Sequence, residues 1–195
     1  MMKLTKKDLL PYQEYQNFHE KFLQEVIQEK KVLRVNISDK MSGVFETKLT
    51  VFYQVQEMIR AEQIEDETYI DDMLEVYNEL LPEKNELSMT FFIEIPNQQE
   101  LRAFNKTIIG VENHVQLHFA GTSVTSYEPD DEKNDEEENY TQSVHYLHFP
   151  FTGEQREQFL KASQVSLKVA HPNYQAEKEL SKELVQKLQD QLSEN

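Results

Sequence analysis

The sequence predicts an α+β fold whose C-terminal half is a ferredoxin-like plait, and three observations support this. Apolar residues recur mainly at helical spacing in residues 1–86, whereas short apolar runs typical of strands dominate 87–170. The elements expected over 87–170 follow the order β-α-β-β-α-β, which is that of a split βαβ plait. Both halves of that order also carry a strand, a proline and a Gln/Glu-rich helix start, at Glu94-Ile95-Pro96 and at His148-Phe149-Pro150.

Residues 1–86 are expected to form a helical and hairpin segment. A capping box at Thr5 to Asp8 opens the first helical region, which Pro11 interrupts. The pattern then predicts, in order, a helix to about Lys30, a strand over 32–37, a strand at 44–45 that closes a hairpin, a helix over 50–63 and a helix over 68–81. Pro82 ends the last of these helices.

The rest of the chain is expected to complete one domain over residues 1–195. The predicted elements are a strand over 87–95, a helix over 97–108, a strand over 115–119, an acidic loop over 128–139, a strand over 143–149, a helix over 153–162 and a strand over 165–169. A C-terminal helix is predicted over 175–192, because Leu180, Leu184, Leu188 and Leu192 recur at four-residue steps. Such a narrow stripe is typical of a packing helix and less often of an oligomer contact.

Composition excludes several classes of protein. The chain has 195 residues and no cysteine, so it holds no disulfide, no cysteine-ligated zinc or iron–sulfur cluster and no cysteine nucleophile. Its formal net charge of −16 argues against nucleic acid as a partner. The four glycines form neither common phosphate-binding loop. Because no apolar run approaches the roughly 20 residues of a membrane span and no signal peptide is evident, we expect a cytoplasmic protein with no membrane association.

The acidic loop carries eight acidic residues and one lysine between Glu128 and Glu138. Its composition is that of a solvated extension between two strands. A docking segment for a basic partner is the alternative. Divalent-cation binding would require an ordered geometry that this composition does not promise.

Several motifs along the chain resemble a bacterial family of uncharacterised proteins, a domain of unknown function. They are Glu46-Thr47-Lys48-Leu49-Thr50, the run Tyr-Gln-x-Gln-Glu-Met-x-Arg over 53–60, Tyr77 to Pro82, Thr90 to Glu94, Ile109 to Glu112, Ser143 to His145 and His171 to Tyr174. The matching segments cover nearly the whole chain in the family's order. The resemblance implies no established activity. It implies a context instead, because members tend to be encoded near rubrerythrin-like proteins and iron–sulfur redox proteins.

The helix expected over 50–63 holds most of the candidate site. Tyr53, Glu57 and Arg60 are spaced so that they can touch on one helix face. Arg60 is a candidate to clamp a carboxylate or phosphate, and an ion pair that merely fixes the helix is the alternative. Glu62 falls within the apolar stripe of that helix, so it requires a partner or a position at the helix end. The candidate ligand-binding residues are Glu46, Tyr53, Gln56, Glu57, Arg60, Glu62 and Glu94. If the carboxylates converge, they favour a metal site or an acid–base pair.

The histidines give a weaker signal. His114 and His118 share one face of a strand, opposite the apolar residues between them, and are expected on its polar side. A metal site there would need a further ligand from a neighbouring strand. His145 and His148 have opposite parities, so a single strand cannot direct both to one metal.

Two functions from different classes follow. The first is a non-catalytic cytoplasmic binding or accessory protein in a redox or oxidative-stress context, with a redox or iron–sulfur protein as its partner. The second is an enzyme or metal-binding protein that uses the carboxylate and arginine residues of the helix over 50–63. The two are distinguished by whether those side chains meet in one concave pocket.

Overall fold

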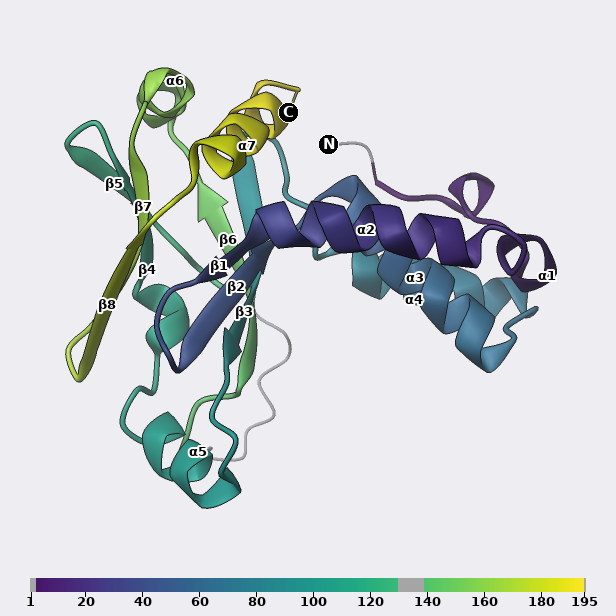
Figure 1. Cartoon of the computed structure of the whole chain (residues 1–195), viewed down its shortest axis with the longest axis horizontal. Coiled ribbons are helices and arrows are strands. Elements are labelled where there is room, and N and C mark those ends of the chain that lie inside the picture. Colours follow the sequence, from purple (N-terminus) through teal and green to yellow (C-terminus); the bar gives the residue numbers. More distant parts are fainter. Residues whose placement is uncertain (1–2, 130–138, 195) are drawn as a thin grey trace.

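The computed structural model describes residues 3–129 and 139–194 (Figure 1). The α-helices are α1 (Tyr12–Tyr15), α2 (His19–Leu33), α3 (Lys48–Glu62), α4 (Glu67–Asn78), α5 (Gln98–Asn105), α6 (Gly153–Lys161) and α7 (Lys182–Glu194), with 3-10 turns η1 (Lys6–Asp8) and η2 (Val111–Asn113). The strands are β1 (Arg34–Asn36), β2 (Met41–Phe45), β3 (Glu86–Ile93), β4 (Val115–Phe119), β5 (Thr122–Thr125), β6 (Val144–Pro150), β7 (Val165–His171) and β8 (Tyr174–Glu179). The predicted α+β class is confirmed. None of these helices is long and apolar enough to cross a bilayer.

The strands form two antiparallel four-stranded sheets. Sheet A has the order β1-β2-β3-β6, and sheet B has the order β5-β4-β7-β8. Just after β5, Tyr127 exchanges two backbone hydrogen bonds of 2.8 and 2.9 Å with His148 of β6, so this segment joins the two sheets along one edge. Inward-facing side chains of both sheets and the apolar stripe of α7 make one shared core.

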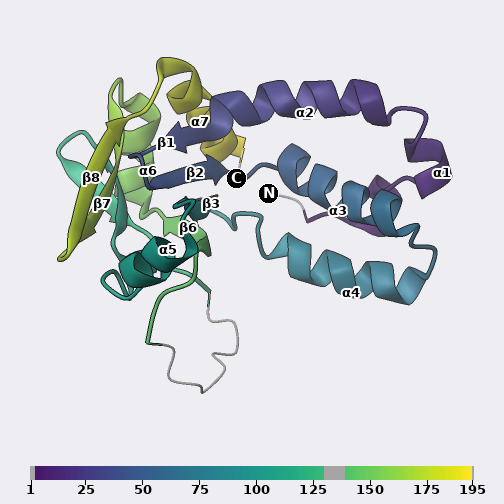
Figure 2. The ribbon, with the colours of Figure 1, turned by 60° about the horizontal axis from the view of Figure 1, so that its bottom comes forward.

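The helices α1 to α4 form a separate helical arm that extends away from the sheets (Figure 2). Val51, Val55 and Ile59 line one stripe of α3 and pack against Met73 and Leu74 of α4 in a second apolar cluster. The spacing of these residues predicted the stripe, which is confirmed. Asp66 caps α4, which runs from Glu67 to Asn78, whereas the sequence predicted this helix over 68–81.

The ferredoxin-like plait predicted over 87–170 is not confirmed, because its four strands are divided between the two sheets. β3 pairs with β6, whereas β4 pairs with β7. A plait would place its last strand, here β7, beside β3. The N-terminal hairpin takes that position, since β2 pairs with β3 over its whole length.

Two strands were not predicted. β5 follows β4 through a two-residue turn in which Ala120 and Gly121 both have positive φ, and this turn lacks the usual Asn-Gly signal. β8 lies on the edge of sheet B and is largely exposed, so it shows no apolar alternation. The predicted C-terminal helix over 175–192 is therefore shorter, because α7 begins only at Lys182. The acidic loop predicted over 128–139 lies, apart from its ends, outside the described residues.

Gly43 provides a test of the close packing in sheet A. A Cβ atom added there would lie 2.4 Å from the Met89 sulfur, and Met89 is buried. We expect Gly43→Ala to lower the free energy of unfolding by about 1–3 kcal/mol, because the methyl group overfills this part of the core. Gly153→Ala is the control: a Cβ there meets nothing within 4 Å, and the change should be neutral or stabilising by up to about 1 kcal/mol. Urea denaturation measures both, and equal stabilities would contradict the packing argument.

Candidate functional site

Glu46 lies at the junction between β2 and α3 and is 4% exposed. Its carboxylate accepts hydrogen bonds from the hydroxyls of Thr50 and Thr90 and from the side-chain amide of Gln54. Its backbone carbonyl accepts a bond of 2.9 Å from the Gln191 amide of α7. The buried carboxyl group of Glu46 thus has hydrogen-bond partners from β3 and α3, which is what a buried polar group requires.

Glu57 lies at the centre of a polar cluster in the helical arm. Arg60 donates to it over 2.9 Å, the Tyr15 hydroxyl donates over 3.0 Å, and His19 Nε2 lies 3.1 Å away. Burial alone would raise the pKa of the Glu57 carboxyl, but the bonds from Arg60 and Tyr15 and the nearby His19 outweigh it and hold this pKa below its usual value. The Glu57–Arg60 contact therefore neutralises both groups within the arm.

Gln56 and Tyr53 have packing partners. The Gln56 amide is fully buried and exchanges two hydrogen bonds with the backbone of Leu10, which fixes the N-terminal segment against α3. The Tyr53 ring lies against Phe22, and the ammonium group of Lys30 sits 5.4 Å from the centre of the Tyr53 ring. Burial, and then the charge of Glu57, raises the pKa of the Tyr53 hydroxyl.

The last two carboxylates lie elsewhere. Glu62 is exposed at the last position of α3, which is one of the two positions expected for it. Glu94 follows β3 and is half-exposed; it accepts bonds of 2.9 and 3.1 Å from Arg34 and a further bond from the Ser42 hydroxyl.

The seven predicted site residues therefore do not converge in one pocket. Along α3, the nine residue-to-residue steps from Lys48 to Glu57 alone span about 14 Å of helix axis, so Glu46 and Glu57 have different surroundings. Across residues 3–129 and 139–194, no group of three His, Asp or Glu side chains is arranged to hold a metal ion.

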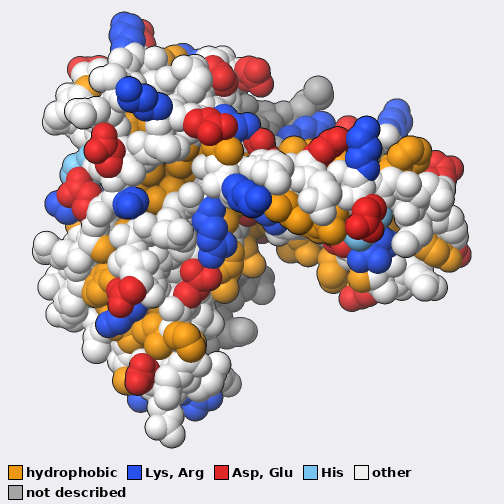
Figure 3. All heavy atoms as spheres, in the orientation of Figure 1, with side chains coloured by type: hydrophobic (Ala, Val, Ile, Leu, Met, Phe, Trp, Pro, Cys, Tyr) orange, Lys and Arg blue, Asp and Glu red, His pale blue; other side chains and the backbone are white. Residues whose placement is uncertain are grey.

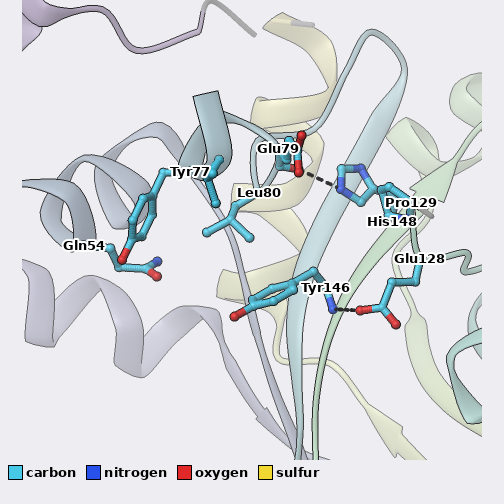
Figure 4. A pocket seen from close by; sticks show the side chains of 9 residues that line it. Gln54, Tyr77, Glu79, Leu80, Glu128, Pro129, Tyr146 and His148 are labelled. Atoms are coloured by element: carbon cyan, nitrogen blue, oxygen red, sulfur yellow. Dashed lines mark hydrogen bonds between the residues drawn. The ribbon is translucent and has the colours of Figure 1, made fainter. Parts of the chain in front are cut away.

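A cleft lies between the helical arm and β6, with a cavity of about 250 Å³. It is lined by Gln54, Val76, Tyr77, Glu79, Leu80, Glu128, Pro129, Tyr146 and His148. Figure 4 shows Tyr77 of α4 and Tyr146 of β6 on either side of Leu80, with Gln54 of α3 nearby. Gln54 also donates to Glu46, so one wall of the cleft is tied directly to the buried carboxylate. We call this hollow the α4–β6 cleft.

Two histidine–glutamate pairs lie beside this cleft, and one residue of each pair, His148 and Glu128, also lines it. Nδ1 of His148 lies 3.2 Å from Glu86, and its Nε2 donates to the carbonyl of Glu79 over 3.0 Å. The hydroxyl of Tyr127 donates to the same Glu86 carboxylate. Burial alone would raise the pKa of the Glu86 carboxyl; the bonds from His148 and Tyr127 outweigh it and lower that pKa.

The second pair joins His145 and Glu128. His145 Nδ1 lies 2.8 Å from the Glu128 carboxylate, which also accepts the backbone N–H of Tyr146 over 2.6 Å. Burial alone would raise the pKa of the Glu128 carboxyl, but the His145 contact and the Tyr146 bond lower it. His145 and His148 face opposite sides of sheet A, as their parities predicted, so the pairs fix the Tyr127–Glu128 segment to β6 from both faces.

A second hollow, of about 560 Å³, lies between the N-terminal segment and helices α3 and α4. Most of its lining is apolar, and Lys6 at its rim already pairs with Asp71 and Glu67. It therefore offers a ligand few unused polar groups.

The histidines of sheet B do not form a metal site within the described residues. Nε2 of His118 donates a hydrogen bond of 2.8 Å to the side-chain oxygen of Gln116 on the polar face of β4. His114 packs edge-on against His171, whose Nε2 donates to the carbonyl of Ile109.

Comparison with known proteins decides the family. The model of a family described as "Protein of unknown function (DUF3501)" matches residues 3–192. The chain belongs to the DUF3501 family. No curated protein matches it. The chain is similar to a novel protein of unknown function from Burkholderia pseudomallei whose crystal structure is known, and the two sequences are 28% identical. The two structures superpose with a TM-score of 0.90, and the match covers 98% of this DUF3501 chain and 100% of the Burkholderia chain.

Sequence reasoning missed the cleft of this DUF3501 protein because its residues come from distant segments. Tyr77 and Pro82 lie within one matched motif, but nothing in the sequence pairs α4 with β6. Glu128 was assigned to the acidic loop, although its carboxylate is fixed against His145. One sequence signal did point towards the cleft: the segment Ser143 to His145, which matches the family, directly precedes the lining residue Tyr146.

Replacing Glu46 tests whether its buried carboxylate is structural. We expect Glu46→Ala to lower the free energy of unfolding by about 3 kcal/mol, because the hydroxyls of Thr50 and Thr90 lose their buried acceptor. The control is Glu94→Ala, which removes a half-exposed ion pair and should cost at most about 1 kcal/mol. Urea denaturation compares the two variants. Similar losses of unfolding free energy would show that the Glu46 carboxyl group stabilises the fold no more than a surface ion pair does.

The two histidine–glutamate pairs predict a pH dependence of stability. A carboxyl group whose pKa is lower in the folded protein binds fewer protons when folded, so it stabilises the fold above its unfolded pKa. That stabilisation is lost as the pH falls from about 4.5 through the lowered pKa values of Glu86 and Glu128. The double variant Glu86→Gln/Glu128→Gln should therefore lose less stability than the wild type on acidification over this range.

The matched control is Glu75→Gln/Glu183→Gln, which replaces two exposed glutamates. Its stability should fall with pH as the wild type does, measured by urea midpoints across the same range. A Glu86→Gln/Glu128→Gln profile parallel to that of the control would contradict the assignment.

Proposed function

We propose that this protein is a non-catalytic binding or accessory protein and that the α4–β6 cleft is its binding site. The observation that supports the proposal is the concave cleft itself, which combines apolar walls with polar groups from three elements, Gln54 of α3, Tyr77 of α4 and Tyr146 of β6. Recognition sites characteristically place a few polar groups in a mostly apolar hollow.

Exposed apolar side chains around the cleft support the same proposal. Val76 is 64% exposed and Tyr69 lies on the same helix, while Tyr146 and Val144 are exposed on the outer face of β6. Clustered apolar side chains on a surface are typical of interaction sites. Figure 3 shows the other side of the arm, where α2 lies in front of α3 and α4, and hydrophobic side chains also reach the surface there.

The placement of the predicted carboxylates favours binding over catalysis. The enzyme alternative required the carboxylates of Glu46, Glu57, Glu62 and Glu94 in one pocket with Arg60. Three of them have separate partners instead, namely hydroxyls for Glu46, Arg60 for Glu57 and Arg34 for Glu94, and Glu62 is exposed at the end of α3. This separation is why we do not build the proposed function on these carboxylates and Arg60.

The proposal extends to the cellular context. We place the chain as a single domain in the cytoplasm, serving a redox or oxidative-stress system, with a redox or iron–sulfur protein as the partner. The family resemblance supports this context, and the lack of cysteine means that any cluster belongs to the partner.

Purification from the native host without chelators, followed by native mass spectrometry and elemental analysis, tests the proposal. A redox protein should co-purify with the wild-type chain. Val76→Asp, which adds a charge to the cleft rim, should reduce its retention at least tenfold. Phe18→Asp is the matched control, since Phe18 is 60% exposed at the start of α2 and lies outside the cleft.

Two outcomes would contradict the proposal. Equal retention of the partner by Val76→Asp and by the wild type would exclude the cleft as the binding site. A stoichiometric metal ion on the isolated chain would favour the metal-binding alternative instead.

A further inference from the structure

We propose that the α4–β6 cleft receives the guanidinium group of an arginine side chain from a partner protein. The inference rests on the proposed function and names the chemistry that the site recognises. It is carried by the kinds of side chain in the cleft, by their free atoms and by the size of the cavity.

The lining combines carboxylates with aromatic rings, and neither Lys nor Arg occurs among its described residues. Tyr77 and Tyr146 contribute the rings. Glu79 contributes a carboxylate for which no side-chain contact is found in the described part of the chain, whereas the Glu128 carboxylate is already held by His145 and by the N–H of Tyr146. His148 also lines the cleft, but its nitrogens are engaged by Glu86 and by a backbone carbonyl, so any charge on it is balanced. The cleft is therefore arranged for a positively charged group.

The rings are available for such a group. Tyr146 is 43% exposed, and in the described part of the chain neither its hydroxyl nor that of Tyr77 takes part in a hydrogen bond. Both rings border the same space (Figure 4), where their faces and hydroxyls are open to a ligand.

Size and shape favour guanidinium among the organic cations. A cavity of about 250 Å³ is smaller than the range of about 300–1,000 Å³ typical of sites for drug-sized ligands, and it suits one long side chain. The guanidinium group is planar and weakly hydrated, stacks on aromatic faces and donates two parallel hydrogen bonds to a carboxylate. The net charge of −16 would also attract a basic partner.

The test is a titration with the capped peptide Gly-Arg-Gly, followed by the amide resonances of α4 and β6. Its isostere Gly-citrulline-Gly has nearly the same shape without the charge. We expect the arginine peptide to shift resonances around Leu80 and Tyr146 and to bind at least tenfold more tightly than the citrulline peptide. Added salt should weaken its binding.

Variants of Tyr146 and of Glu79 assign the interaction to the cleft. Tyr146→Leu should weaken binding of the arginine peptide at least fivefold, whereas Tyr146→Phe should retain it. Tyr140→Leu is the control, because Tyr140 is equally exposed, at 43%, and lies outside the lining. Glu79→Gln should weaken binding about threefold. Glu75→Gln, an exposed change on the same helix outside the lining, should leave binding unchanged.

The outcomes separate this inference from the proposed function. Equal binding of the arginine and citrulline peptides, or no shift at the cleft with either, would overturn the guanidinium assignment. The proposed function would still stand if Val76→Asp lost the native partner. If Val76→Asp retained that partner, the proposed function itself would fail.

Discussion

The buried carboxylate of Glu46 is the constraint on which the arrangement of sheet and arm depends. It lies where β2 ends and α3 is about to begin, so it fixes the direction in which the helical arm leaves the sheet. Thr90 donates to it from β3, Thr50 and Gln54 donate from α3, and Gln191 of α7 donates to its backbone carbonyl. An apolar residue could fill the space but could not satisfy donors from different elements at once. A buried carboxyl group with hydrogen-bond partners from several elements is therefore able to specify one geometry at this junction.

The shape of the cleft follows from this junction and from a second anchor on β6. Gln54 leads from the Glu46 network to one wall of the cleft. Glu86 and Glu128 hold the other wall, because their histidine contacts fix the Tyr127–Glu128 segment against β6. Some of the anchoring groups, such as Glu128 and His148, also line the cleft, but their side chains are held by partners within the fold. The rings of Tyr77 and Tyr146 are therefore the groups available for contact with a ligand.

The sequence predicted what depends on local spacing and failed where remote pairing decides. The stripe of Val51, Val55 and Ile59 is set by the helix period, and the alternation of β4 by the strand period, so both were predictable. The plait failed because an N-terminal strand, β2, takes the edge of β3, and no local pattern encodes that choice. In the candidate site, the Glu57–Arg60 contact followed from a three-residue spacing. The pairs formed by His145 and His148 did not, because their partners lie 17 and 62 residues away along the chain.

The arrangement of the charged groups supports the proposed role in recognition more than a role in acid–base chemistry. A catalytic carboxyl must reach the substrate and change its protonation near the working pH. Glu57, Glu86 and Glu128 all have pKa values lowered by their hydrogen-bonding partners, which keeps them ionised at neutral pH. Their partners Arg60, His148 and His145 hold these three carboxylates in place, so they are not arranged to exchange protons with a ligand. In the proposed recognition mode, the Glu79 carboxylate beside the open rings of Tyr77 and Tyr146 selects the charge of the ligand, and the walls of the cleft select its shape.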